Sequence, residues 1–422
     1  MAAARGEVHR ADLSIGAVVT IGRGATIGAM AEAPRTLEDA DDGLNEDAQR
    51  LYARLGARPV INAAGAYTVL GGSQLSPGVR AAMDTANLYF ADMRALLESS
   101  GRVIADMLGV ESAYVTAGAA TALVLSVAAC LTKDHRDYLE RLPDTEGIPN
   151  EVIVPRNQRQ KYDRNLITAG ARLVEVGDEH GMTPAQVSAA IGPQTAAVFY
   201  FVPLQGPEPG VPPLEDVVAA AHAKGVPVIV DAAGHTYPLD NLRKYARAGA
   251  DLVCYAAKYF DAPHSTGMVV GRKEYVELVA VNSFIGFETS GYLTIGRPMK
   301  IDRQEIFALV EALREWLAMD HEGRLLRYGE RCDLVLRELS GAGGVEAYRL
   351  TEREVPTPVV REGVRVLLKG RSAESVAQAL KDGEPSIWVR TEGESLIVSV
   401  AFCDDAEMAL VARRLREVLT GS

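Results

Sequence analysis

The stretch Asp251-Leu-Val-Cys-Tyr-Ala-Ala-Lys258-Tyr-Phe-Asp-Ala-Pro-His264-Ser-Thr-Gly267 places a lysine in unusual surroundings. A short apolar strand runs into small residues and Lys258, and a turn containing proline and glycine follows. Most lysines are solvated surface residues, whereas this apolar lead-in favours burial. A buried lysine has a lowered pKa and becomes a usable amine nucleophile and base. We therefore predict that Lys258 is chemically reactive.

An aspartate ends another apolar run earlier in the chain, Val226-Pro-Val-Ile-Val-Asp231. A lysine that forms a Schiff base and an aspartate that keeps a pyridine nitrogen protonated are the groups that pyridoxal phosphate chemistry requires. Asp231 alone would be an ordinary turn residue, so its functional interpretation depends on Lys258. Ala233 is small enough for a ring to lie flat against the strand. His235 is a further candidate cofactor ligand. The preferred alternative is that it is a core histidine whose hydrogen bonds are satisfied within the protein.

A loop of small residues, Thr116-Ala-Gly-Ala-Ala-Thr121, lies between a predicted strand at 113–116 and an almost uncharged predicted helix at 119–131. Small side chains leave backbone N–H groups open, and a helix N-terminus favours an anion. The alternative is a tight strand–helix turn packed against a sheet. Together with Asp231 and Lys258 downstream, the loop predicts a cofactor phosphate site made of Ala117, Gly118, Ala119 and the Thr121 hydroxyl.

The composition excludes several other classes of protein. The chain has 422 residues, 48% hydrophobic and 24% charged, which suits two or three globular domains. A net charge of −12 repels phosphate backbones, so nucleic acid is not an expected partner. No apolar run reaches the ~18 residues that span a membrane. The four cysteines and seven histidines lack metal-binding spacing, so no metal is expected, and free thiols suit the cytoplasm.

Apolar strands interleaved with helices predict an α/β fold with a mostly parallel sheet covered on both faces. Ligands of such sheets bind at the carboxyl ends of strands, where Asp231 and Lys258 both lie. We predict a flexible or accessory N-terminal extension (1–43), a helix and arm (44–64), a large cofactor-binding domain (65–300), a connecting helix (301–324) and a small α/β domain (325–422).

These motifs together resemble the fold-type-I pyridoxal phosphate enzymes of the SelA-like group. That group includes the bacterial L-seryl-tRNA selenium transferases and the D-glucosaminate-6-phosphate ammonia-lyases. The resemblance covers about residues 50–420, and the segment around 142–163 is more similar to the ammonia-lyase branch. It rests on the motifs above and on Val60-Ile-Asn62-Ala-Ala-Gly65, Leu142–Val154 and Ile295-Gly-Arg297-Pro-Met-Lys300.

The resemblance implies a large domain with a seven-stranded type of sheet, and a homodimer or larger oligomer with active sites at subunit interfaces. Arg297 and Lys300 would then lie near the substrate or the cofactor phosphate, supplied by either subunit. Their alternative role is to cap a helix beginning near Ile301, although positive charge is unfavourable at a helix start. Asn62, Arg159 and His264 complete the set of expected substrate-binding residues.

Three positions depart from the pattern of the group. Gln158 stands where the ammonia-lyase-like sequences have a histidine expected to stack on the cofactor, and glutamine cannot act as an acid or base. Tyr255-Ala-Ala257 replaces the usual Ser-Gly-Gly and removes a small hydroxyl that could bind phosphate. Pro263-His264-Ser replaces Pro-Gln-Ser. We keep Gln158 and Tyr255 among the expected cofactor neighbours and infer that the substrate differs from those of the named relatives.

The sequence thus predicts a pyridoxal phosphate-dependent enzyme acting at the α and β carbons of an amino acid or amino sugar acid. Lys258 would carry the Schiff base and move the α-proton, and β-elimination would release a 2-oxo acid and ammonia. The sequence leaves open a transferase that replaces the β-group, as selenium transferases do, and also a racemase, aldolase or aminotransferase. A cofactor-binding protein without catalysis is disfavoured, because it need not keep both Lys258 and Asp231.

Overall fold

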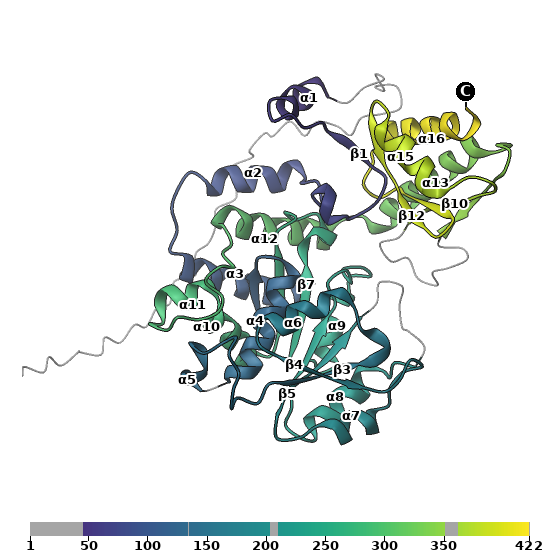
Figure 1. Cartoon of the computed structure of the whole chain (residues 1–422). Coiled ribbons are helices and arrows are strands. Elements are labelled where there is room, and N and C mark those ends of the chain that lie inside the picture. Colours follow the sequence, from purple (N-terminus) through teal and green to yellow (C-terminus); the bar gives the residue numbers. More distant parts are fainter. Residues whose placement is uncertain (1–44, 134, 203–209, 351–361, 422) are drawn as a thin grey trace, which may run out of the picture. The chain divides into compact units, whose positions relative to one another are not determined.

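The computed structural model describes residues 45–133, 135–202, 210–350 and 362–421 (Figure 1). The predicted extension at 1–43 lies outside these residues. The first described helix, α1 (Glu46–Ala53), buries none of its side chains and leaves Leu51 58% exposed. Its apolar side chains are therefore not covered by the rest of the described chain.

A seven-stranded sheet forms the centre of the large domain. Its order is β2-β8-β7-β6-β5-β3-β4. Strands β7, β6, β5, β3 and β4 are parallel, and β8 runs antiparallel to both of its neighbours. The prediction of a mostly parallel α/β sheet is confirmed. The strand bounds are β2 (Ser112–Thr116), β3 (Glu151–Pro155), β4 (Arg172–Val176), β5 (Thr195–Phe201), β6 (Val228–Asp231), β7 (Leu252–Ala256) and β8 (Gly267–Gly271).

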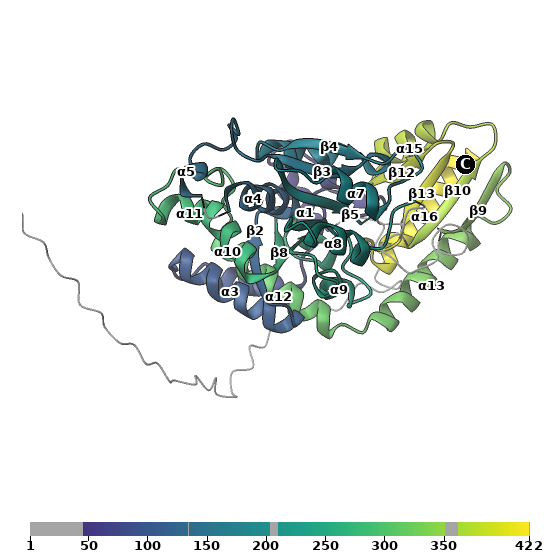
Figure 2. The same cartoon turned by 90° about the horizontal axis from the view of Figure 1, so that it is seen from below.

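Helices cover both faces of this sheet (Figures 1 and 2). Helix α4 (Gly118–Thr132) is buried from Thr121 to Thr132, as its lack of charge predicts, and packs on β7 and β8. Helix α9 (Asn241–Arg247) lies on the opposite face of β7. The other helices of the domain are α2 (Pro77–Ala86), α3 (Met93–Leu108), α5 (Arg136–Leu139), α6 (Arg164–Thr168), α7 (Pro184–Ala190), α8 (Leu214–His222), α10 (Lys273–Asn282) and α11 (Phe284–Thr289), with 3-10 turns η2 (Thr68–Leu70), η3 (Arg156–Gln158), η4 (Lys161–Asp163) and η5 (Ala257–Phe260).

The strand register brings the three predicted cofactor elements to one edge of the sheet. Asp231 ends β6 opposite Cys254 of the parallel strand β7, and η5 with Lys258 follows β7 directly. Strand β2 is antiparallel to β8, which is antiparallel to β7, so β2 and β7 end at the same edge. Gly267 pairs with both Thr116 and Ala256, so a single strand separates the two loops.

The small domain has a separate apolar core and its own sheet. Antiparallel strands lie in the order β12-β13-β10-β9, and β1 of the N-terminal arm pairs in parallel with β11. Ile61 of β1 is buried in this second core. The predicted domain boundaries remain a prediction. The elements are β1 (Val60–Asn62), α13 (His321–Leu339), β9 (Val345–Arg349), β10 (Gly363–Leu368), α15 (Ala373–Asp382), β11 (Ser386–Trp388), β12 (Arg390–Glu392), β13 (Ser395–Ser399) and α16 (Asp405–Thr420).

The connection between the domains is helical. Helix α12 (Arg303–Ala318) packs against α2 and α3, and its buried face includes Leu309 and Trp316. It starts with a capping box, in which Asp302 and Glu305 each bond the other's backbone N–H. This cap fixes where the long helix begins.

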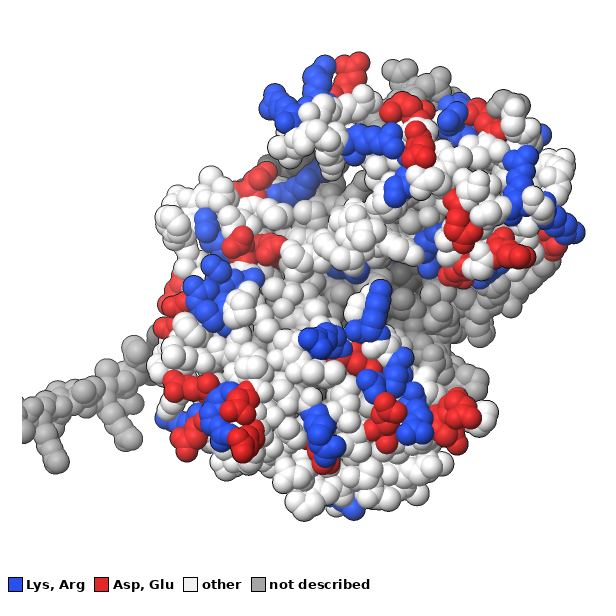
Figure 3. All heavy atoms as spheres, in the orientation of Figure 1, with Lys and Arg blue, Asp and Glu red and all other residues white. Residues whose placement is uncertain are grey.

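Charge is mixed on the face shown in Figure 3, where acidic and basic side chains alternate and neither sign forms a continuous surface. None of the described helices combines the length and the apolar character needed to cross a lipid bilayer. Within the described ranges, no group of three or more His, Cys, Asp or Glu side chains is placed to hold a metal ion. The four cysteines are buried free thiols.

Candidate active site

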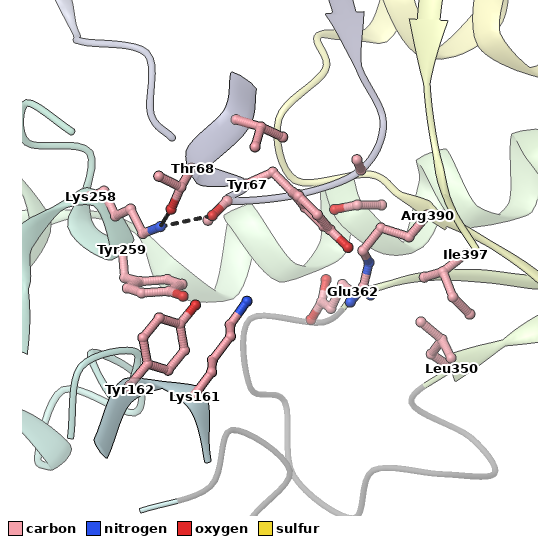
Figure 4. A pocket seen from close by; sticks show the side chains of 15 residues that line it. Tyr67, Thr68, Lys161, Tyr162, Lys258, Tyr259, Leu350, Glu362, Arg390 and Ile397 are labelled. Atoms are coloured by element: carbon pink, nitrogen blue, oxygen red, sulfur yellow. Dashed lines mark hydrogen bonds between the residues drawn. The ribbon is translucent and has the colours of Figure 1, made fainter. Parts of the chain in front are cut away.

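Lys258 lies in η5, at the carboxyl end of β7, with its amine directed into a cavity (Figure 4). Its Nζ donates hydrogen bonds to the carbonyl of Ala66, at 3.0 Å, and to the hydroxyl of Thr68, at 3.3 Å. Partial burial lowers the pKa of Lys258. A lowered pKa increases the neutral fraction of the amine, which is the form that acts as nucleophile and base.

The loop before α4 provides an open helix N-terminus. The N-cap residue Ala117 makes no side-chain capping bond, and Gly118 has φ +82°, a conformation that favours glycine. Ala117, Gly118 and Ala119 are half-buried, and Thr121 lies in the first turn with 8% of its surface exposed. Unbonded N–H groups at a helix start favour an anion, so the geometry suits a phosphate.

Gly267, the first residue of β8, packs against this loop and was missed by sequence reasoning. A Cβ added there would lie 2.5 Å from the carbonyl carbon of Gly118 and 2.7 Å from the amide nitrogen of Ala119. Only glycine therefore allows β8 to pass beneath the start of α4. Its position next to the turn after Lys258 was the available signal.

Asp231 ends β6 with only 4% of its surface exposed. One carboxylate oxygen accepts the N–H of Ala233 at 3.1 Å. Burial raises the pKa of Asp231 to about 6, a net value that includes the lowering effect of the Ala233 bond and the raising effect of the nearby charge of Asp163. A buried carboxyl with so little compensation is stabilised by a cationic partner. Half-buried Ala233 leaves room beside it.

Two expected cofactor neighbours instead lie in the core. The Nδ1 atom of His235 is 2.8 Å from the hydroxyl of Tyr245, and His235 is 4% exposed, which matches the core alternative. Tyr255 is fully buried, and its hydroxyl donates to the carbonyl of Asn241 in α9. Side chains alternate along a strand, so Tyr255 points away from the face where Cys254 meets α4. The expectation that Tyr255 contacts the cofactor is corrected by this placement.

The cavity beside Lys258 has a volume of about 380 Å³ and is formed by both domains. Figure 4 shows Lys258 and Thr68 on one side, Arg390 and Glu362 on the other, and Lys161 and Tyr162 reaching in from η4. The cavity is lined by Ala64, Gly65, Ala66, Tyr67, Thr68, Val69, Lys161, Tyr162, Lys258, Tyr259, Leu350, Glu362, Arg390, Ile397 and Ser399.

Besides Lys161, sequence reasoning missed a second cation of the cavity wall, Arg390. Its side chain is 16% exposed, and Nη1 is 3.5 Å from Glu392. Its Nε atom is buried without a hydrogen-bond partner among the described residues. A guanidinium group with an unused donor suits a carboxylate, which it binds through two parallel hydrogen bonds. No local motif marks this arginine, because the folding of the small domain brings it to the cavity.

Asn62 and Arg159 already use their polar atoms within the chain. Asn62 accepts the N–H groups of Ala64 and Gly65 through Oδ1 and donates to the Gly65 carbonyl through Nδ2. It therefore fixes the turn that forms one wall of the cavity. Arg159 binds the carboxylates of Asp163 and Glu175, and these bonds raise the pKa of Arg159.

Of two further residues predicted at the site, Gln158 is buried and His264 is half-buried. Gln158 is 6% exposed and donates to the carbonyl of Phe201 at 3.3 Å. The Nδ1 atom of His264 is buried without a hydrogen-bond partner among the described residues. Burial, together with the charge of Lys258, lowers the pKa of His264, so its ring is held neutral near that lysine. Gly72 allows the close packing, since a Cβ there would lie 2.1 Å from Nδ1.

Arg297 and Lys300 are not brought to this cavity within one chain. Arg297 pairs with Glu288 at 2.7 Å and lies over the ring of Phe287, and Lys300 is exposed. The residue that caps α12 is Asp302, and neither Arg297 nor Lys300 has this role. The helix-capping alternative is therefore wrong. Their contribution from a neighbouring subunit remains a prediction.

The side chains present fit pyridoxal phosphate. The open start of α4 suits its phosphate, the buried carboxyl of Asp231 suits a protonated ring nitrogen, and the amine of Lys258 suits its aldehyde. Lys161 and Arg390 leave positive charge for an anionic substrate on the opposite side of the cavity.

Comparisons with known proteins support this fit to pyridoxal phosphate, although no model of a protein family matches the chain. The D-glucosaminate-6-phosphate ammonia lyase of Salmonella typhimurium is 32% identical over 87% of this chain and 97% of its own length. The 5'-C-glycyluridine monooxygenase-decarboxylase of a Streptomyces species is 33% identical over 87% of this chain and 92% of its own.

A more distant relative is the L-seryl-tRNA(Sec) selenium transferase of Moorella thermoacetica, which is 24% identical over 87% of this chain and 83% of its own. A solved structure of D-glucosaminate-6-phosphate ammonia-lyase superposes with a TM-score of 0.76 at 29% identity, over 88% of this chain and 98% of that one. The likeness therefore extends through both domains.

Proposed function

We propose that this chain, which belongs to the D-glucosaminate-6-phosphate ammonia lyase family of pyridoxal phosphate-dependent enzymes, carries out β-elimination on a hydroxylated amino acid or amino sugar acid. Membership makes it a pyridoxal phosphate-dependent enzyme of fold type I. The proposal adds the reaction, which yields a 2-oxo acid and ammonia. The observation that carries it is the meeting of Lys258, Lys161, Arg390 and Glu362 around one cavity.

Each of these residues has a task in such a reaction. When bound, pyridoxal phosphate supplies an aldehyde carbon for the substrate amine and a ring that accepts electrons from a bond at Cα. Asp231 keeps a proton on the ring nitrogen, and the N–H groups at the start of α4 hold the phosphate. Lys258 takes the proton from Cα through Nζ.

The substrate is held by the wall opposite Lys258. Arg390 binds the α-carboxylate through its guanidinium fork, and its buried Nε supports this role. Lys161 lies over the ring of Tyr162 at 5.0 Å and offers charge to a second anionic or hydroxylated part of the substrate. A cavity of about 380 Å³ leaves space for more than the smallest amino acids.

Two other outcomes share the same machinery. A transferase would capture the eliminated product with a nucleophile instead of water, as the relationship to selenium transferases suggests. A second candidate function is oxidative decarboxylation of an amino acid, because the monooxygenase-decarboxylase relative is as similar as the ammonia lyase. Elimination and replacement both break the Cα–H bond, whereas decarboxylation breaks the bond between Cα and the carboxylate, so decarboxylation needs a different bond to lie perpendicular to the ring.

A substrate panel separates these reactions. Purified holoenzyme is given β-hydroxy and β-phospho amino acids and amino sugar acids, and ammonia, 2-oxo acid, carbon dioxide and oxygen uptake are measured. Ammonia with 2-oxo acid and no oxygen uptake supports the lyase. Carbon dioxide release that consumes oxygen supports the decarboxylase, and exchange of the α-proton alone supports a racemase.

We also propose that the enzyme is a homodimer or higher oligomer in the cytoplasm. The segment between α2 and α3 exposes Leu88, Tyr89 and Phe90 by 72%, 80% and 94%. Three consecutive exposed apolar side chains favour burial against another subunit. Buried free thiols on all four cysteines fit a reducing compartment.

A further inference from the structure

Among the described residues that line the cavity beside Lys258, Glu362 alone carries a carboxyl group. It directly precedes β10, and its carbonyl accepts the N–H of Val400 at 3.2 Å, which fixes its backbone. Figure 4 shows it across the cavity from Lys258 and beside Arg390. Glu362 also lines a smaller adjoining cavity of about 70 Å³ that shares Lys258 and Tyr259. An acid and a base thus face each other across the space for substrate.

The surroundings of Glu362 favour its protonated form. The side chain is half-buried and has no hydrogen bond or ion pair within 4 Å among the described residues. Burial raises the pKa of Glu362 to about 7, even though the charges of Arg324 and Arg349 lower it. Other described titratable and charged groups around it are Tyr328 of α13, Asp261 of the adjoining cavity, and the cavity residues Lys258, Lys161, Tyr67, Tyr162, Tyr259 and Arg390.

Elimination of a hydroxyl group needs a proton donor besides Lys258. Loss of the Cα proton to Lys258 supplies electrons to expel the β-substituent, but an unprotonated hydroxide is a poor leaving group. General acids are most effective when their pKa lies near the working pH, and they contribute roughly 10²–10⁴-fold. A phenol is ordinarily a much weaker acid than a carboxyl group, so a glutamate suits this role near neutral pH better than a tyrosine.

We propose that Glu362 is the general acid that protonates the β-leaving group, an inference that rests on the proposed elimination. The Cα–H bond breaks and its proton goes to Nζ of Lys258, while the electron pair forms the Cα–Cβ double bond. The Cβ–O bond breaks, and the oxygen keeps its electron pair, takes the proton of Glu362 and departs as water. The Glu362 carboxylate then regains a proton from solvent. The enamine product hydrolyses to the 2-oxo acid and ammonia.

Two leaving groups test this role. Wild-type holoenzyme and Glu362→Gln are assayed on serine and on β-chloroalanine, each in both configurations, with pyruvate and ammonia as products. Chloride leaves without a proton, whereas hydroxide needs one. We expect Glu362→Gln to lose roughly 10²–10⁴-fold on serine and to stay within about tenfold of wild type on β-chloroalanine. Glu362→Asp should recover part of the loss, and Glu330→Gln, an exposed change on α13, should match wild type.

Deuterium uptake at Cα identifies the step that is lost. The Glu362→Gln variant should still exchange the α-proton of serine with solvent at the wild-type rate, because Lys258 is unchanged. Equal losses on serine and β-chloroalanine, or no loss on serine, would overturn the role of Glu362. A wild-type enzyme that eliminates from none of the substrates of the panel described above, nor from serine or β-chloroalanine, would contradict the proposed function itself, and the general acid with it.

Infrared titration of the cofactor-free protein provides a readout that does not depend on turnover. The difference between wild type and Glu362→Gln should contain a carboxylic acid band that titrates near pH 7. A carboxyl that is fully ionised at pH 6 in this difference spectrum would contradict the proposed donor. The same spectra report whether the variant is folded.

Discussion

At the scale of single residues, the positions of Lys258 and Asp231 at strand ends could be predicted because each follows an apolar run. Lys258 and Asp231 are polar residues at the ends of buried runs, which is a local pattern. Lys161, Glu362 and Arg390 carry no such pattern, and they reach the cavity only through the folding of a 3-10 turn and a second domain. Tyr255 was misplaced because strand alternation turns it toward α9.

The buried carboxyl of Asp231 makes the stability of the cofactor-free protein depend on pH. Its folded pKa of about 6 lies above the ordinary value of 3.8, so the folded state binds more protons than the unfolded state between these values. Stability from this group is therefore complete below pH 3.8 and is lost as pH rises through about 6.

Asp231→Asn should consequently stabilise the cofactor-free protein at pH 8, on the order of 2–3 kcal/mol relative to its effect at pH 4. Urea unfolding at the two pH values measures this difference. The exposed Asp84→Asn serves as the matched control and should show no such dependence. A variant that is equally or less stable than wild type at pH 8 would refute the buried, unpaired state of Asp231.

At the scale of elements, the parallel sheet was predictable because apolar strands alternate with helices in the sequence. The order of the strands was not, since it depends on which β-strands pair across the sheet. The observed order places β8 between β2 and β7 and so puts Gly267 against the loop before α4. The pairing also divides the segment 386–392 between two strands, because Ile387 pairs with β1 and Arg390 pairs with β13.

Gly267→Ala should weaken cofactor binding and lower the thermal stability. The added Cβ would press on Gly118 and Ala119, and overpacking of this kind costs about 1–3 kcal/mol. Because Gly118 and Ala119 would be displaced at the start of α4, where the cofactor phosphate is expected to bind, affinity for pyridoxal phosphate should drop by roughly tenfold to a hundredfold.

Equilibrium titration of the cofactor-free protein with pyridoxal phosphate measures this effect. Gly192→Ala is the matched control, because nothing lies within 4 Å of its added Cβ and its φ is not positive. Undiminished affinity in Gly267→Ala would show that the start of α4 does not hold the phosphate.

At the scale of the whole molecule, the two domains together form the cavity, and the N-terminal arm joins the core of the small domain through β1. Pattern analysis found both domains but could not predict their contact, which depends on side chains far apart in sequence. The same holds for Arg297 and Lys300, whose distance from the cavity in one chain leaves their predicted role to a second subunit.

Phe90→Asp should convert the proposed oligomer to a monomer. Phe90 is 94% exposed in the single chain, and a charge in an apolar interface is costly to bury. Light scattering after size-exclusion chromatography should change from at least twice the chain mass to 45.2 kDa. Leu326→Asp, at a 71% exposed position of α13, should leave the mass unchanged. A wild-type protein that already runs as a monomer would contradict the interface.

The central claim is that Lys258 carries the cofactor of a pyridoxal phosphate enzyme. Borohydride reduction of the purified protein, followed by proteolysis and mass spectrometry, tests it most directly. We predict a yellow protein whose colour is lost on reduction and a phosphopyridoxyl group on the peptide that contains Lys258. The Lys258→Ala variant should show no labelled lysine and no turnover. A colourless protein that takes up no pyridoxal phosphate, or a label on a different lysine, would contradict the account.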